Sequence, residues 1–208
     1  MLLPRLKRLL AVCIVPALIV YISILVLSAK IGIKPALVLR DLLQTCEEPM
    51  AVGMISSLGY LLWAAAASIC LFASISGVVG KLVWRQLLML GGVFSAVLCF
   101  DDLFLLHDRY IGQEFLYISY AIVALIILLR FRQLIVQVDV VSFLVSVLLL
   151  GLSILSDKLQ LILPVEYSTV QLFEEGFKFI GIACWLVFWS QASRYGIKLQ
   201  SSPSSHDG

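Results

Sequence analysis

Ionisable residues inside apolar segments are the feature of this sequence that could do chemistry. A carboxylate close to lipid is costly, and such residues usually mark a functional site. The set consists of Asp101, Asp102, His107, Asp108, Glu114, Asp157, Glu174, Glu175 and Lys178. Carboxylates and an imidazole serve as general acids and bases or as metal ligands. The sequence therefore indicates a polar site, and the chemistry depends on how helices position these groups.

The first group of these residues is Asp101, Asp102, His107 and Asp108. A single helix through this group would place two carboxylates and the imidazole along one crevice. At about 100° per residue, Asp101 and Asp108 are nearly eclipsed, and His107 borders the same face. The same geometry turns Asp102 away from this face and stacks it over Arg109, seven residues later. The alternative interpretation is structural, with Asp102 paired to Arg109 or to a neighbouring helix and His107 as an interface residue.

The second group is a charge triplet near the start of the last apolar segment. Ser168 followed by Gln171 matches a capping box, which predicts a helix start. Lys178 is four residues from Glu174 and three from Glu175, so it lies between them on a helix. One alternative is that the triplet neutralises itself and only orients two helices. Its net negative charge, however, calls for a metal ion, a proton or a charged histidine.

These arguments give explicit candidate roles. The candidate catalytic residues are Glu174, Glu175 and His107, and the candidate metal ligands are Asp101, His107, Asp108, Glu174 and Glu175. With one histidine in the set, a three-histidine zinc site is excluded. A mostly oxygen site with one imidazole suits Mg²⁺, Mn²⁺, Fe or a strained Zn²⁺. The sequence identifies no cofactor, and a divalent metal is the candidate that it offers.

Glu174, Glu175 and Lys178 form an EExxK pattern. It resembles a motif of the glutamate-type intramembrane proteases, which comprise the CAAX-processing and bacteriocin-immunity group and the PrsW-like group. The resemblance implies a glutamate that activates water and downstream His or Asp motifs that complete the site. The match covers five residues, and His107 precedes the glutamates in this chain.

The composition defines the elements that must carry this site. The chain has 208 residues, of which 62% are hydrophobic and 13% are charged, whereas soluble domains carry about 25% charged residues. So few charges cannot cover a water-facing surface, so we expect an integral membrane protein. The net charge of +2 and the lack of a basic tract argue against nucleic acid as a partner. The five cysteines show no CxxC spacing, so they indicate neither a disulfide framework nor a zinc knuckle.

Six apolar stretches have about the length that a helix needs to cross a bilayer. They are Leu9–Ser28, Met54–Ile75, Leu87–Leu106, Glu114–Phe131, Val140–Leu155 and Val170–Ser190. We therefore predict an all-α polytopic bundle of about six transmembrane helices. Residues 1–200 would form a single domain, followed by a disordered polar tail over 201–208. Gly176 and Gly181 are candidates for close helix packing.

The loops predict an orientation. Nine Lys and Arg residues would lie on the side of both termini and five on the other, which places both termini in the cytoplasm. Eleven of the thirteen acidic residues then lie on the outer side or in the outer part of a span. The short loops favour a bacterial inner membrane. The site would open outward between the third and sixth spans.

Three classes of function fit these observations. The first is a membrane-embedded hydrolase or transferase with a lipid-like substrate. The second is a non-catalytic assembly factor that binds a membrane protein partner. The third is a cation or proton transporter, which would need polar residues along its whole path. The lipid bilayer is the surrounding partner in all three.

Overall fold

A computed structural model describes residues 11, 14–34, 46, 49, 51–160 and 167–201. Every regular element in these ranges is helical, and none of them contains a strand. This confirms the predicted all-α class. The chain divides into two compact units, Met1–Gly53 and Met54–Gly208. The single domain over residues 1–200 stays a prediction, and the predicted tail after Ser201 lies outside the described residues.

The first unit contains helix α2 (Val15–Lys30). A proline stands in its first turn, where the missing N–H costs nothing. Just beyond its C-terminal end, Gly32 adopts a φ of 80°, which glycine accepts without steric cost. The helix has 16 residues, fewer than the roughly 20 that span a bilayer. The first part of the predicted span Leu9–Ser28 lies mostly outside the described residues.

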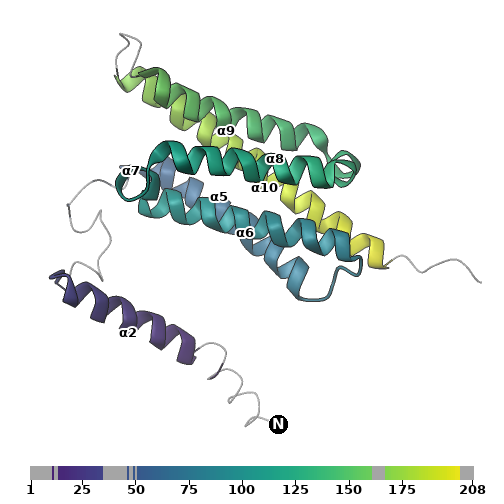
Figure 1. The fold of residues 1–208 in the computed structure, drawn as a ribbon, viewed down its shortest axis with the longest axis horizontal. Coiled ribbons are helices and arrows are strands. Elements are labelled where there is room, and N and C mark those ends of the chain that lie inside the picture. The colour runs from purple at the N-terminus through teal and green to yellow at the C-terminus, as the bar shows by residue number, and fades with distance from the viewer. Residues whose placement is uncertain are drawn as a thin grey trace, which may run out of the picture. The chain divides into compact units, whose positions relative to one another are not determined.

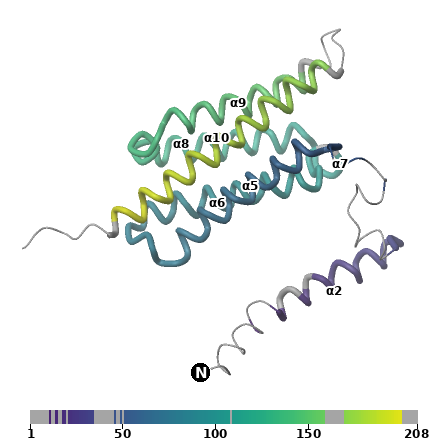
Figure 2. Tube along the Cα trace, turned by 180° about the vertical axis from the view of Figure 1, so that it is seen from behind, coloured from purple at the N-terminus to yellow at the C-terminus, as the bar shows by residue number. Residues whose placement is uncertain are grey.

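The second unit is a bundle of long helices joined by short connections (Figure 1). Its elements are α5 (Met54–Ile75), α6 (Leu82–Phe104), α7 (Leu106–Arg109), α8 (Gln113–Val138), α9 (Val140–Gln160) and α10 (Tyr167–Ser201). Helix α10 packs along α9 on one side and α5 on the other, and α5 packs along α6 (Figure 2). Helix α10 therefore joins the two halves of the bundle.

Four helices of the described chain are long and apolar enough to cross a membrane. They are α5, α6, α8 and the segment Val140–Lys158 of α9. Helix α10 has 35 residues, but the charges at Glu174, Glu175 and Lys178 interrupt its apolar sequence. The expected membrane-helix character is thus present, whereas the count of six spans and the side of each terminus stay predictions.

Aromatic side chains form the centre of the second unit. The Trp185 ring lies 6.0 Å from that of Trp63, 5.9 Å from that of Phe94 and 5.4 Å from that of Trp189. Its indole N–H donates a 2.9 Å hydrogen bond to Ser95 Oγ. Because the polar atom has a partner, the whole indole is buried without an unmet hydrogen bond.

Small residues let neighbouring helices approach closely. A Cβ atom at Gly91 would lie 2.1 Å from Trp189 Cη2, and one at Gly181 would lie 3.0 Å from Leu150 Cγ. Ser146 also donates a 2.9 Å hydrogen bond to the Gly181 carbonyl. The packing role expected of Gly181 is therefore confirmed. Gly176 has no atom within 4 Å of its Cβ position, so the same expectation was wrong there.

We expect Gly91→Ala to lower the free energy of unfolding by about 1–3 kcal/mol, the usual cost of overpacking a core. The added methyl group would overlap the Trp189 ring, which is fully buried and cannot move aside. Gly151→Ala is the matched control, since its Cβ meets open space and alanine favours a helix. Equal unfolding midpoints for the two variants would contradict this account of Gly91.

Asp139 separates α8 from α9 and caps the second of these helices. Its carboxylate accepts hydrogen bonds from the Ser142 backbone N–H at 3.1 Å and from Ser142 Oγ at 2.5 Å. These two donors lower the pKa of Asp139 below its ordinary value. The cap explains why α9 begins at Val140, the start that the sequence predicted.

Asp139→Ala should lower the free energy of unfolding by about 1 kcal/mol at neutral pH, the typical effect of losing an N-cap. The pKa of Asp139 is depressed in the folded protein. Its contribution to stability is therefore fully present above the ordinary aspartate pKa, and it disappears as the pH falls through the pKa that Asp139 has in the folded protein. Melting temperatures of wild type and variant should therefore converge in acid. Asp139→Asn, which keeps the acceptor oxygen, is the control. A difference in melting temperature between wild type and Asp139→Ala that stays constant with pH would refute the assignment of Asp139 as the charged cap of α9.

Candidate functional site

The chain reverses direction at the end of α6. Leu105 adopts left-handed backbone angles, φ 52° and ψ 46°, a conformation that non-glycine residues rarely hold. Helix α6 therefore stops at Phe104, and the short helix α7 begins at Leu106. The expectation of one continuous helix through Asp108 was wrong. The turn instead brings α7 back over the last turn of α6.

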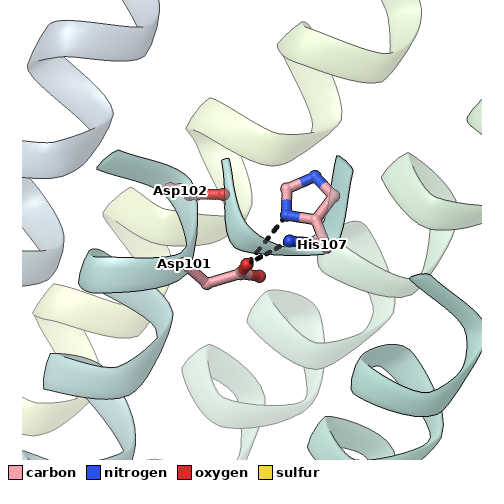
Figure 3. Close-up of side chains that lie close together, drawn as sticks. All are labelled: Asp101, Asp102 and His107. Atoms are coloured by element: carbon pink, nitrogen blue, oxygen red, sulfur yellow. Dashed lines mark hydrogen bonds and ion pairs between the residues drawn. The ribbon is translucent and has the colours of Figure 1, made fainter. Parts of the chain in front are cut away.

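This turn pairs His107 with Asp101. The His107 backbone N–H donates to Asp101 Oδ1 at 2.9 Å, and the ring atom Nδ1 lies 3.0 Å from the same oxygen (Figure 3). Tyr120 of α8 lines the same cavity as this carboxylate. The side chains of Asp101 and His107 are 4% and 11% exposed. A carboxylate at Nδ1 fixes the ring orientation and turns Nε2 away from the pair.

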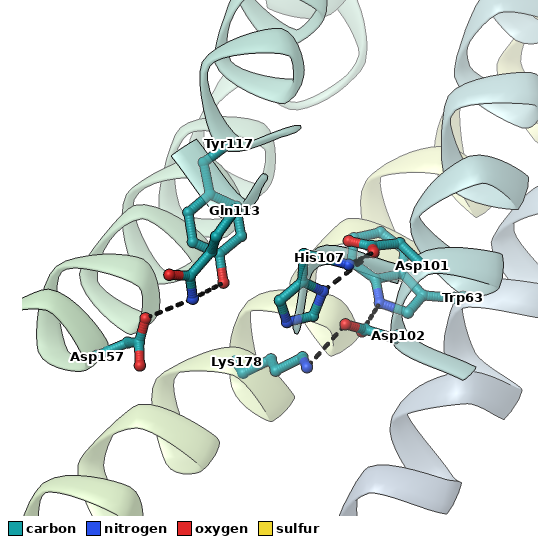
Figure 4. Close-up of polar contacts among 8 residues, drawn as sticks. All are labelled: Trp63, Asp101, Asp102, His107, Gln113, Tyr117, Asp157 and Lys178. Atoms are coloured by element: carbon teal, nitrogen blue, oxygen red, sulfur yellow. Dashed lines mark hydrogen bonds and ion pairs between the residues drawn. The ribbon is translucent and has the colours of Figure 1, made fainter. Parts of the chain in front are cut away.

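Asp102 joins three helices. One carboxylate oxygen accepts the Trp63 indole N–H of α5 at 3.0 Å, and the other lies 2.8 Å from Lys178 Nζ of α10 (Figure 4). The expected contact between the third and sixth predicted spans is thus present. Of the two partners expected for Asp102, a neighbouring helix is confirmed. Arg109 was wrong, because the break at Leu105 removes it from the helix that carries Asp102.

The two aspartates face a cavity of about 210 Å³. Its polar lining lies at the end of the bundle near α7 and consists of Asp101, Asp102, His107, Tyr117, Tyr120, Ser153, Glu174 and Lys178. Its apolar lining includes Phe94, Leu98, Ala124, Val147, Leu150 and Trp185. The cavity therefore has a charged end and a hydrophobic end, as a site for an amphipathic molecule requires.

The structure separates the two glutamates. Glu174 lines the main cavity together with Lys178, whereas Glu175 lines a second pocket of about 10 Å³ beside Tyr60 and Ile182. Only one of the two candidate catalytic glutamates thus shares a cavity with His107. Asp108 belongs to α7, and its side chain lies outside the described part of the chain.

The neutral side chain of Gln113 links the start of α8 to the end of α9. Gln113 Nε2 donates to Asp157 Oδ2 at 2.8 Å and to the Tyr117 hydroxyl at 3.2 Å, and Lys158 Nζ donates to Gln113 Oε1 at 2.7 Å. Sequence reasoning missed Gln113, Trp63 and Tyr120. Uncharged polar residues at helix ends and within apolar runs are too common to stand out, and their roles appear only once the helices pack.

A divalent ion fits this arrangement poorly. Asp101, Asp102 and His107 each offer one donor atom, and these atoms lie within 4.8 Å of one another. However, both oxygens of Asp102 already have donors, and the Lys178 ammonium stands where a cation would bind. The Oδ1 atom of Asp101 likewise faces two nitrogen atoms of His107. The residues form a charge-paired network.

Fold and site together define a helical protein with four candidate membrane spans and a buried acid–base cluster at one end of an amphipathic cavity. The family model described as "Domain of unknown function (DUF8692)" matches residues 9–192. The chain therefore belongs to this family. The searches of curated proteins and of solved structures returned no match.

Proposed function

We propose that this protein is a multi-pass membrane enzyme that hydrolyses or transfers a group of a lipid-like substrate within the cavity. The Asp101–His107 pair carries the proposal, because it lies at the polar end of a cavity whose remaining walls are apolar. An imidazole held by a carboxylate is the usual arrangement of a general base. The acids of the EExxK pattern are secondary in this reading, with Glu174 the one that faces the same cavity.

The proposed reaction follows from the two ring nitrogens of His107. With the ring proton on Nδ1, which lies 3.0 Å from Asp101 Oδ1, Nε2 would carry a lone pair and take a proton from water as the water oxygen attacks the substrate. The bond to the leaving group then breaks, and Nε2 returns the proton to that group. Asp101 stabilises the imidazolium that exists between these steps. An alcohol in place of water would make the same reaction a transfer.

The proposed setting is a bacterial inner membrane with both termini in the cytoplasm. The excess of Lys and Arg in the loops on the side of the termini supports this orientation. Helix α7 and the polar end of the cavity would then lie near the outer surface. Water would reach His107 from that side, and the apolar end would lie at the depth of the lipid chains.

The test uses the two histidines of the chain as a matched pair. Wild type, His107→Gln and His206→Gln would be reconstituted in vesicles of a bacterial lipid extract, and the lipids would be compared by mass spectrometry over time. We expect new products with wild type and His206→Gln and none with His107→Gln. Product profiles that do not differ between wild type and His107→Gln would reject the enzymatic proposal.

A non-catalytic membrane partner is the second candidate, and one observation favours it. Asp102 links α5, α6 and α10 through Trp63 and Lys178, so part of the polar cluster holds helices together. If the whole cluster were structural, His107→Gln would lower the melting temperature and leave the lipids unchanged. Transport is less well supported, because buried Phe94 and Trp185 line the inner end of the cavity.

A further inference from the structure

One buried serine that lines the cavity has a hydroxyl group without a partner in the protein. Ser153 of α9 is 6% exposed and belongs to the cavity wall. Within the part of the chain that the structure describes, its hydroxyl makes no hydrogen bond. The other buried serines of that part each donate a hydrogen bond, and they are Ser74, Ser95, Ser146 and Ser193. Because a buried hydroxyl without a hydrogen bond is costly, Ser153 is suited to bind a molecule inside the cavity.

Ser153 lies at the same depth in the bundle as the ring of His107. Helices α8 and α9 are antiparallel neighbours joined by a single residue, and Gln113 of α8 donates to Asp157 of α9 (Figure 4). Tyr117 lies four residues after Gln113 along α8. Ser153 lies four residues before Asp157 along α9, so both lie one helical turn, roughly 6 Å, deeper than that bonded pair. The Tyr117 ring centroid is 5.6 Å from that of His107, so a group bound at Ser153 lies at the level of the proposed base.

The ionisable groups of the cavity lining already have partners. Asp101 is paired with His107. Asp102 is paired with Lys178, and Glu174 also interacts with another group. A charged ligand would have to break one of these pairs or stay without a counter-charge, and an uncompensated buried charge is strongly unfavourable. The polar group that fits beside Ser153 is therefore uncharged and able to form a hydrogen bond.

The wall of the cavity becomes apolar at greater depth than Ser153. On α9, Leu150 and Val147 line it three and six residues before this serine. On α6, Leu98 and Phe94 line it deeper in the bundle than the two aspartates. Hydrocarbon is the part of a ligand that such a wall binds. The ligand is thus an amphiphile whose polar group lies at Ser153 and whose chain extends away from α7.

We propose that the cavity binds an uncharged ester or amide of a fatty acid, whose carbonyl oxygen accepts a hydrogen bond from the Ser153 hydroxyl. A carbonyl carbon is the electrophile that the proposed attack by water requires, and a hydrogen bond donated to its oxygen favours that attack. The part that Ser153 plays in turnover rests on the proposed function above, whereas binding of the ligand does not. The inference narrows the substrate class from lipid-like molecules in general to uncharged acyl compounds.

The stability of Ser153→Ala tests whether the hydroxyl serves a ligand or the fold. We expect its melting temperature, without ligand, to equal or exceed that of wild type, because the change removes a buried polar group that the protein leaves unpaired. Ser146→Ala is the matched control on the same helix. Ser146 donates a 2.9 Å hydrogen bond to the Gly181 carbonyl, so its loss should lower the melting temperature. A Ser153→Ala protein that is destabilised as much as Ser146→Ala would overturn the inference.

Tryptophan quenching measures binding of the ligand. The full chain in alkyl maltoside micelles would be titrated with a monoacylglycerol brominated near the end of its chain. The comparison is the glycerol monoether of equal length, which lacks the carbonyl group. Trp63 and Trp185 line the cavity and are 2% and 1% exposed, so a chain inside the cavity reaches them and a chain in the micelle is kept away. We expect the ester to quench at a mole fraction about five-fold lower than the ether, the effect of one neutral hydrogen bond.

The preference for the ester should depend on Ser153. Ser153→Ala should bind ester and ether equally, whereas Ser156→Ala should keep the preference, since Ser156 donates to the Leu152 carbonyl of its own helix. The brominated amine and carboxylate of equal chain length should need mole fractions at least about ten-fold higher than the ester, because neither charge finds a free partner. Equal quenching by ester and ether in wild type, an ester preference that survives in Ser153→Ala, or tighter binding of a charged analogue would overturn the inference. An ester preference together with unchanged lipids in the His107→Gln comparison would instead reject only the proposed reaction.

Discussion

Replacing Lys178 with methionine should lower the free energy of unfolding by about 3 kcal/mol. The change removes the ammonium group that lies 2.8 Å from Asp102 and leaves a nearly buried carboxylate without its counter-charge. Removing one partner of a buried ion pair typically costs about 3–5 kcal/mol. We expect a loss at the lower end of this range, because the Lys178 side chain is 27% exposed. Reversible unfolding in mixed detergent micelles would measure the loss.

The control variants separate charge from packing. Asp102→Asn added to Lys178→Met should restore part of the stability, because a neutral amide at that place leaves no uncompensated charge. Lys158→Met is the matched single variant, since Lys158 donates to the neutral Gln113 and its loss should cost only about 1 kcal/mol. Equal losses for the two lysine variants would remove the Asp102–Lys178 pair from this explanation of the fold.

Asp101→Asn should reduce the turnover of the lipid substrate by about 10²–10⁴-fold, the range that general acid–base catalysis contributes. Asparagine retains the size of the side chain but loses the negative charge that orients His107 and stabilises its imidazolium. The acidic limb of the pH–rate profile should also move to lower pH, because an imidazolium without a nearby negative charge loses its proton more easily. Initial rates across pH in reconstituted vesicles would measure both effects.

Tyr120→Phe provides the comparison for that variant. It removes a hydroxyl group from the cavity that Asp101 lines and keeps the charge and the His107 contacts. We therefore expect a rate loss below about ten-fold, since one neutral hydrogen bond contributes about 1 kcal/mol. Asp101→Asn with the wild-type pH profile and rate, in a protein of normal melting temperature, would show that Asp101 has no part in positioning the base.

The sequence by itself determined the all-helical class and several of the helix boundaries. The segment predicted as Met54–Ile75 has those bounds as α5, and the start predicted at Val140 is that of α9. These features depend on local information, namely runs of apolar residues and a cap such as Asp139. The sequence also singled out the ionisable residues of the site, because charges are rare enough in an apolar chain to be conspicuous.

Only the tertiary structure decided how those residues combine. The left-handed turn at Leu105 breaks the predicted helix, and no propensity rule places a leucine there, since the surrounding contacts must hold it. The partners of Asp102 are Trp63, 39 positions away, and Lys178 on another helix. Glu174 and Glu175 are adjacent in sequence but face different pockets, because consecutive helical residues point about 100° apart. Which of them shares a cavity with His107 depends on the rotation of α10 against its neighbours. Aromatic packing around Trp185 fixes this rotation, and the local sequence does not encode it.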